Sequence, residues 1–113
     1  MKKLILALFC GLVSLSAVAG GNIAKGEAVA KKNNCAACHG ANFDKPIDPS
    51  YPKLAGQHAD YLEHALKAYK RGDGPNGRNN AIMGGQVKPL SNEDMADLAA
   101  YLHSLPTDLV LKR

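Results

Sequence analysis

Two cysteines and a histidine stand within one five-residue stretch, Cys35-Ala36-Ala37-Cys38-His39. On a single helical turn, thiols three positions apart can reach the two vinyl groups on one edge of a porphyrin, and the histidine that follows can present a ring nitrogen to the iron. The stretch therefore predicts one haem, attached covalently through Cys35 and Cys38, with His39 as an axial ligand of the iron.

Three other uses of these cysteines are less favoured. A thioredoxin-like redox pair would need a βαβ pattern, which the sequence lacks, and a zinc site would need a second pair of Cys or His residues at compact spacing. A disulfide between Cys35 and Cys38 would close too short a loop to stabilise the fold much. The adjacent His39 favours haem attachment over all three.

The sixth coordination position of such an iron decides between an electron carrier and a catalyst. The side chains that could fill it are Met83, Met95, His58, His64 and His103. Met95 lies on an apolar helical stripe, where methionine usually packs, and the three histidines lie on a charged helix face or near helix ends. Met83 stands in a glycine-rich segment just before Gly84-Gly85, which would let the backbone approach a porphyrin closely. Met83 is the predicted ligand, and an open or His-bound site is the alternative.

The elements that position these groups are predicted to be helices. Residues 23–33 and 57–71 have helical composition and periodicity, and residues 91–105 begin with a capping box and carry an i, i+3, i+4 apolar stripe. No segment alternates as a strand would, so the predicted fold is all-α in a single domain. Gly26 lies inside the first helix, where glycine costs about 1 kcal/mol against alanine, so another element should press against it. Residues 72–89, with five Gly and three Asn, are expected to form an irregular loop.

The first 19 residues have the pattern of a signal peptide. Two lysines precede an almost wholly apolar run from Leu4 to Leu15, and Ala17-Val18-Ala19 supplies the small residues of a cleavage site. An uncleaved anchor is less favoured because the apolar run is shorter than the roughly 20 residues that span a bilayer, and the large residue before Cys10 disfavours lipidation there. We expect cleavage after Ala19, a mature domain at residues 20–113 and a periplasmic location without a membrane-embedded segment.

The charge of the mature chain is small. The 113 residues contain 14 Lys+Arg and 10 Asp+Glu. Removing residues 1–19 takes away two lysines and no acid, which leaves a formal charge of +2. The remaining basic residues occur as short pairs among acids, for example Lys31-Lys32 and Lys70-Arg71, and not as the concentrated basic stripe that a nucleic-acid partner would require.

Four pieces of the sequence resemble one family. They are CAACHG at 35–40, YPKLAGQ at 51–57, the Met83 segment, and LSNEDMADLAAYLHSL at 90–105. Together they cover nearly the whole mature chain and resemble the small class I c-type cytochromes, in particular bacterial monohaem cytochrome c553 and the single-haem halves of the dihaem cytochrome c4 type. The resemblance implies an all-α class I cytochrome c fold, with three to four helices wrapped around one covalently attached haem. The chain departs from the dihaem type because it has only one CxxCH motif.

The resemblance also implies roles for individual residues. The Pro52 carbonyl would accept a hydrogen bond from the ring N–H of the axial histidine, which would fix the ring and raise its basicity. Leu54 would pack on the haem, and Gly26 would cross against Tyr101. Residues 42–50 and 107–113 receive no role. The candidates for binding the haem propionates are Gln57, Arg78, Asn79 and Asn80.

The function expected from these features is periplasmic transfer of single electrons, with no enzymatic turnover. The iron, held by His39 and Met83, would cycle between Fe(III) and Fe(II). The expected partners are redox proteins such as a membrane oxidase, a quinol–cytochrome c reductase or a dehydrogenase, which would dock transiently on the exposed haem edge. That edge is expected to be surrounded by Ala36, Ala37, Ile82 and Gly84, with Lys53 and Lys88 around it. The alternatives are a dedicated haem subunit of a periplasmic flavodehydrogenase and, less favoured, an open-site haem enzyme or gas sensor.

Overall fold

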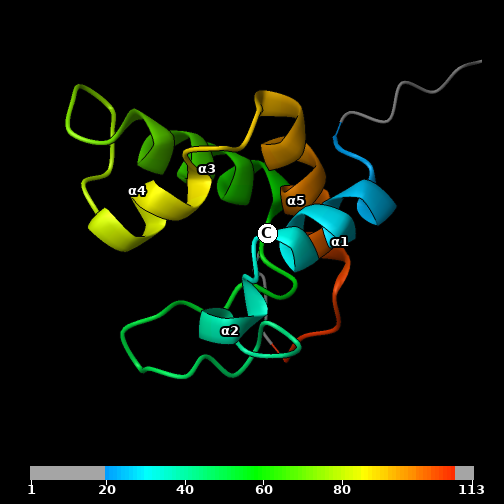
Figure 1. Ribbon diagram of the computed structural model, residues 1–113. Helices are drawn as coiled ribbons and strands as arrows, with labels where there is room; N and C mark the ends of the chain where they lie inside the picture. Colours follow the sequence, from blue (N-terminus) through cyan, green and yellow to red (C-terminus); the bar gives the residue numbers. More distant parts are fainter. Residues whose placement is uncertain (1–19, 109–113) are drawn as a thin grey trace, which may run out of the picture.

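The computed structural model describes residues 20–108, so the expected signal peptide and its cleavage site lie outside the described residues. This part of the chain forms α1 (Ile23–Lys32), α2 (Ala36–His39), α3 (Ala59–Arg71), α4 (Ala81–Val87) and α5 (Asn92–Ser104). No strand occurs between residues 20 and 108, in agreement with the all-α prediction. Figure 1 shows α1 and α5 packed together on one side, α3 and α4 on the other, and the short α2 below them. None of these helices is long and apolar enough to cross a membrane.

Helices α1 and α5 cross at backbone contact. A Cβ atom on Gly26 would overlap the carbonyl oxygen of Asp97 and lie 2.7 Å from the Cβ of Tyr101. The crossing thus explains a glycine inside a helix, and it confirms the expected pairing of Gly26 with Tyr101. A second link lies at the start of α1, where the backbone N–H of Asn22 donates to Oδ1 of the buried Asp97 at 2.7 Å.

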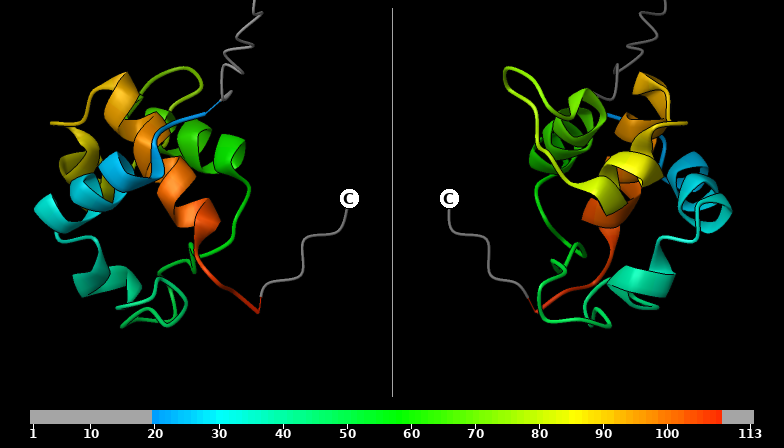
Figure 2. Two further views of the ribbon diagram at one scale, coloured as in Figure 1. Left: turned by 90° about the vertical axis from the view of Figure 1, so that its right-hand side faces the viewer. Right: turned by 60° about the vertical axis from the view of Figure 1, so that its left-hand side comes forward.

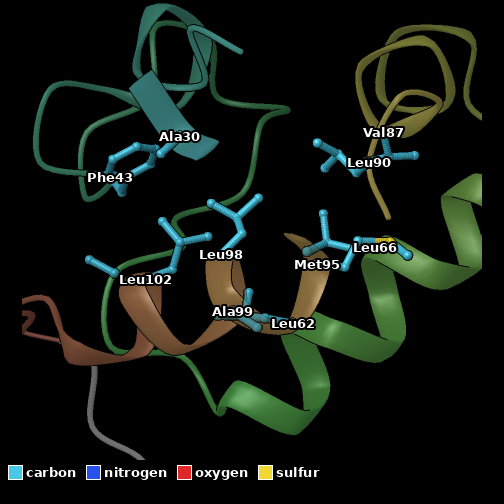
Figure 3. Close-up of a cluster of buried hydrophobic side chains, with 11 residues drawn as sticks. Ala30, Phe43, Leu62, Leu66, Val87, Leu90, Met95, Leu98, Ala99 and Leu102 are labelled. Carbon is cyan, nitrogen blue, oxygen red and sulfur yellow. The ribbon is translucent and has the colours of Figure 1, made fainter. Parts of the chain in front are cut away.

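The hydrophobic core lies between α5 and its neighbours (Figure 3). Helix α5 begins with the predicted capping box, in which Ser91 and Asp94 each bond the other's backbone N–H at 3.0 Å. Its apolar side chains then face Leu62 and Leu66 of α3. Met95 is only 1% exposed in this core. Met95 therefore packs, as its place on the apolar stripe predicts.

Helix α4 lies within residues 72–89, which the sequence predicts to be an irregular loop. Asn80 caps this helix, since its side chain accepts the backbone N–H of Met83 at 2.9 Å. Val87, 1% exposed, anchors the other end of α4 in the core. Two consecutive glycines lower the helix propensity of this stretch, so the expectation of a loop was wrong at Ala81–Val87, where a cap and one buried residue hold the helix.

The segment between α2 and α3 is tied to both α2 and α5, although no role for residues 42–50 was predicted from the sequence. Phe43 is 3% exposed with φ of 58°, and its carbonyl accepts the N–H groups of Leu54 and Ala55 at 2.9 and 3.0 Å. Its ring meets Tyr101 of α5 edge-on, with 6.1 Å between ring centroids. The Ile47 N–H donates to the Cys38 carbonyl at 3.0 Å. Residues 42–50 thus fix α2 against the C-terminal helix.

Candidate functional site

The two cysteines lie on one helical turn directly after α1. Asn34, with φ of 53°, turns the chain, and the Cys35 N–H donates to the Ala30 carbonyl at 3.1 Å. Helix α2 then places Cys35 and Cys38 about one turn apart. Both thiols are free, with no disulfide between them. Burial raises the pKa of the Cys35 thiol, which keeps it neutral at pH 7.

The imidazole of His39 is buried and fixed by one hydrogen bond. His39 is 6% exposed, and its Nδ1 lies 3.0 Å from the carbonyl oxygen of Pro52. The carbonyl can only accept, so Nδ1 carries the proton and donates, and the neutral ring then has its lone pair on Nε2. The Tyr51 ring lies against it, with 6.3 Å between centroids and a 44° angle between planes. His39 is thus held in the tautomer and orientation of a metal-binding histidine.

A cavity opens between α2, α3 and α4 and receives side chains from all of them. His39 and Cys38 of α2 line it, and Met83 reaches it from α4. Most of the remaining wall is apolar and comes from α3, α4, α5 and the segment before α3: Leu54, Leu62, Ala65, Leu66, Ile82 and Leu102. Polar groups also line it: Gln57, Tyr61, Tyr69, Arg78 and Asn80.

This donor set and cavity fit a covalently attached haem. An apolar cavity suits the macrocycle. Cys38 lines this cavity, and Cys35 stands three positions earlier, the sequence spacing of the haem-attachment motif. A neutral imidazole and a thioether on two different helices are the axial donors typical of cytochromes c. Among residues 20–108, no three His, Cys, Asp or Glu side chains come close enough to hold a metal ion.

The other candidates for the sixth ligand lie elsewhere. His58 and His64 share a shallow surface hollow with Asp60. Met95 is buried in the core, and His103 bonds the Gln57 carbonyl oxygen through Nδ1 at 2.7 Å. Of the five side chains considered from the sequence, Met83 is the one that lines the cavity together with His39.

Three tyrosines at the site were not singled out from the sequence. Tyr51 packs on His39, and Tyr61 and Tyr69 line the cavity from α3. The periodicity of α3 places Tyr61 and Tyr69 on its apolar face, but it gives no sign of what that face contacts. Only for Tyr51 was a local signal present, because Tyr51 directly precedes Pro52 in the YPKLAGQ segment.

Comparison with known proteins identifies the class. Residues 23–106 match the Cytochrome c family. The chain is 45% identical over 84 residues to cytochrome c-554(548) of Halomonas halodenitrificans, an alignment that covers 74% of this chain and 96% of that protein. It is 37% identical over 110 residues to cytochrome c4 of Stutzerimonas stutzeri, covering 92% of this chain and 51% of that protein. The chain thus spans about half the length of that cytochrome c4.

The chain belongs to the cytochrome c family. Its cofactor is therefore a covalently bound haem c with iron, and it is an electron-transfer protein and not an enzyme. A further relative is the thiosulfate dehydrogenase electron acceptor of Thiomonas intermedia, 40% identical over 72 residues, which cover 64% of this chain and 31% of that protein.

Proposed function

We propose that this protein is a periplasmic carrier of single electrons, in which Cys35 and Cys38 hold the haem and His39 and Met83 ligate its iron. The observation that supports this most strongly is that a buried histidine oriented by Pro52 and a methionine from another helix line the same apolar cavity. If His39 and Met83 both hold the iron, no coordination site would remain open for substrates or gases.

The side chains around the cavity suit rapid electron transfer without chemistry on a substrate. When bound, the haem supplies the one-electron couple between Fe(III) and Fe(II). Pro52 holds the imidazole of His39 in one orientation, and the Asn80 cap holds the turn that carries Met83. The apolar wall, to which Leu54 contributes, excludes water and favours the less charged ferrous state. The same ligands can therefore serve both oxidation states with little rearrangement.

The proposed location rests on the leader and the chemistry together. Residues 1–19 carry the pattern of a cleavable signal peptide. In bacteria, covalent haem attachment takes place outside the inner membrane. A chain with a CxxCH motif must therefore be exported before haem is attached to it, which agrees with the signal-peptide pattern. Cleavage after Ala19 would give a mature cytochrome domain at residues 20–113.

The proposed docking surface surrounds the cavity mouth. Ala37, Lys53 and Lys88 are exposed, and Ile82 is 54% exposed while it also lines the cavity. The polypeptide charge of +2 falls to about +1 with a ferric haem and two ionised propionates, so long-range steering is weak. We expect small, transient, mostly apolar encounters with an oxidase, a quinol–cytochrome c reductase or a dehydrogenase. Electron-transfer rates should therefore change little with ionic strength, and a steep loss of rate with salt would contradict this surface.

A dehydrogenase partner has one specific observation in its favour. A relative is itself named as the electron acceptor of a thiosulfate dehydrogenase. If this chain is the dedicated haem subunit of such an enzyme, affinity purification from its own host will retain the dehydrogenase in stoichiometric amount. A free carrier will purify alone.

One set of spectra tests the ligand assignment. The purified exported protein should be coloured, should retain haem after denaturation, and should show the weak long-wavelength band of a methionine–iron bond when oxidised. Carbon monoxide should not bind the native reduced form. A colourless protein, or one whose native reduced form binds carbon monoxide readily, would overturn the carrier proposal.

A further inference from the structure

Arg78 is held between two tyrosines at the edge of the cavity. Its guanidinium carbon lies 5.7 Å from the centroid of the Tyr61 ring and 5.4 Å from that of the Tyr69 ring. One guanidinium nitrogen donates to the Tyr61 hydroxyl at 3.4 Å, and the backbone N–H of Arg78 donates to the Ala68 carbonyl at 2.9 Å. Arg78, Tyr61 and Tyr69 all line the cavity. Arg78 is exposed, and contacts with two aromatic rings together with the bond to Tyr61 orient its guanidinium at the cavity.

The charge of Arg78 has no carboxylate partner in the described part of the chain. The ion pairs between residues 20 and 108 join Lys25 to Glu93, Lys31 to Glu27 and Lys67 to Glu63. Hydrogen bonding to Tyr61 and then to Tyr69 raises the pKa of Arg78, so the side chain stays charged. A fixed guanidinium presents a fork of donors that matches a carboxylate in two parallel hydrogen bonds. The guanidinium of Arg78 is therefore available to bind an anion that residues 20–108 do not supply.

The other polar side chains considered for this role bring no charge to the cavity. Asn80 and Gln57 line it, but they are neutral amides whose oxygens accept the N–H groups of Met83 and His58 at 2.9 Å, which leaves only their amide N–H groups to donate to an anion. Asn79 does not line the cavity. Among these candidates Arg78 brings a positive charge, and the other cation on the cavity lining is Lys53, in the segment before α3.

The positions of the helices indicate that the propionates of a bound haem would lie near Arg78. The vinyl and propionate groups of a haem lie on opposite halves of the ring. Attachment to Cys35 and Cys38 would place the vinyl half at α2, so the propionates would lie on the side away from α2. In Figures 1 and 2, the loop between α3 and α4 extends away from α2. Arg78 belongs to this segment and lines the cavity.

We propose that Arg78 binds a haem propionate and that Tyr61 and Tyr69 are positioning residues that hold its guanidinium for this contact. The inference rests on the proposed haem site. Neutralising a propionate removes negative charge from the neighbourhood of the iron, which favours the ferrous state and raises the midpoint potential. Arg78 is thereby a residue that sets the potential without touching the iron.

The test compares two arginines of the holoprotein. Arg78→Gln should lower the midpoint potential and make it fall with rising pH, because the unpaired propionate then titrates closer to neutral pH. Arg78→Lys keeps the charge but loses the forked contact, so its potential should lie between wild type and Arg78→Gln. Arg71→Gln is the matched control: Arg71 bonds the Asn76 carbonyl in the same segment but does not line the cavity, and its loss should barely change the potential.

The outcomes separate this inference from the proposed function. If the oxidised spectrum keeps the methionine–iron band and Arg78→Gln shifts the potential no more than Arg71→Gln does, the inference is wrong while the carrier proposal stands. If wild type lacks haem or that band, the carrier proposal itself fails. Should Arg78→Gln yield no holoprotein, Arg78→Lys and Tyr61→Phe decide: a potential equal to wild type in both variants would overturn the inference.

Discussion

The α1/α5 crossing and the short helix α4 are stabilised by different kinds of contact. At the crossing, Gly26 touches the backbone of Asp97, and a buried carboxylate holds the start of α1. In α4 only Val87 is buried, and the helix begins on the side-chain cap of Asn80. Met83, the proposed iron ligand, belongs to the second region. The fold therefore relies on a tight crossing, whereas the proposed ligand lies on a short helix supported by the Asn80 cap, by Val87 and by the cofactor.

The largest expected effect comes from adding one methyl group at the crossing. Gly26→Ala places a Cβ against the Asp97 carbonyl, which only a backbone shift can relieve, so it should cost about 3 kcal/mol of unfolding free energy. Gly85→Ala in α4 is the matched control, since nothing lies within 4 Å of its added Cβ. It should instead stabilise by up to about 1 kcal/mol through helix propensity. Urea unfolding of both holoproteins checks this, and equal stability of the two variants would contradict the close crossing.

A smaller loss is expected where the crossing uses a buried carboxylate. Asp97→Ala removes the acceptor of the Asn22 N–H and should cost about 2 kcal/mol. Asp97→Asn keeps an acceptor oxygen, so it should cost clearly less. Thermal unfolding of both variants distinguishes the two cases. If Asp97→Asn is as damaging as Asp97→Ala, the negative charge and not the hydrogen bond is what the crossing requires.

Two methionines provide a direct comparison of the regions by spectroscopy. Met83→Leu and Met95→Leu both conserve volume, so Met95→Leu should change the unfolding free energy by less than about 1.5 kcal/mol. Met83→Leu should cost more in the holoprotein, because it also loses the proposed bond to the iron. Met83→Leu should also abolish the methionine–iron band and admit carbon monoxide, because leucine cannot ligate iron. Met95→Leu, in the core, should retain the wild-type spectrum. A normal band in Met83→Leu would remove Met83 from the ligand assignment.

The α1/α5 crossing and helix α4 also differ in how well their structure can be predicted from the sequence. Helices α1, α3 and α5 follow from local periodicity and, in α5, from a capping box, and the CxxCH motif is local as well. Helix α4 was missed because Gly84 and Gly85 oppose helix formation, while the anchoring of Val87 depends on residues distant in sequence. The Tyr61–Arg78–Tyr69 cluster is equally non-local, since it forms only when the segment after α3 folds back onto that helix.

The smallest effect concerns the N-terminal caps of α1 and α4. In each helix an asparagine side chain accepts a backbone N–H at 2.9 Å: Asn22 from Lys25, and Asn80 from Met83. Replacing either by alanine should cost about 1 kcal/mol. In α1 this loss should appear only as lower global stability. In α4 it frays the turn that carries Met83, so added imidazole should displace the ligand about fivefold more readily, since about 1 kcal/mol corresponds to that factor.

Imidazole titration followed by absorption separates the two caps. Asn80→Ser keeps a capping oxygen and should restore near wild-type imidazole affinity, which shows that the cap, and not the amide itself, supports the turn. If Asn22→Ala raises the imidazole affinity as much as Asn80→Ala does, the two regions are energetically coupled, and Met83 depends on the stability of the whole fold and not on its own short helix.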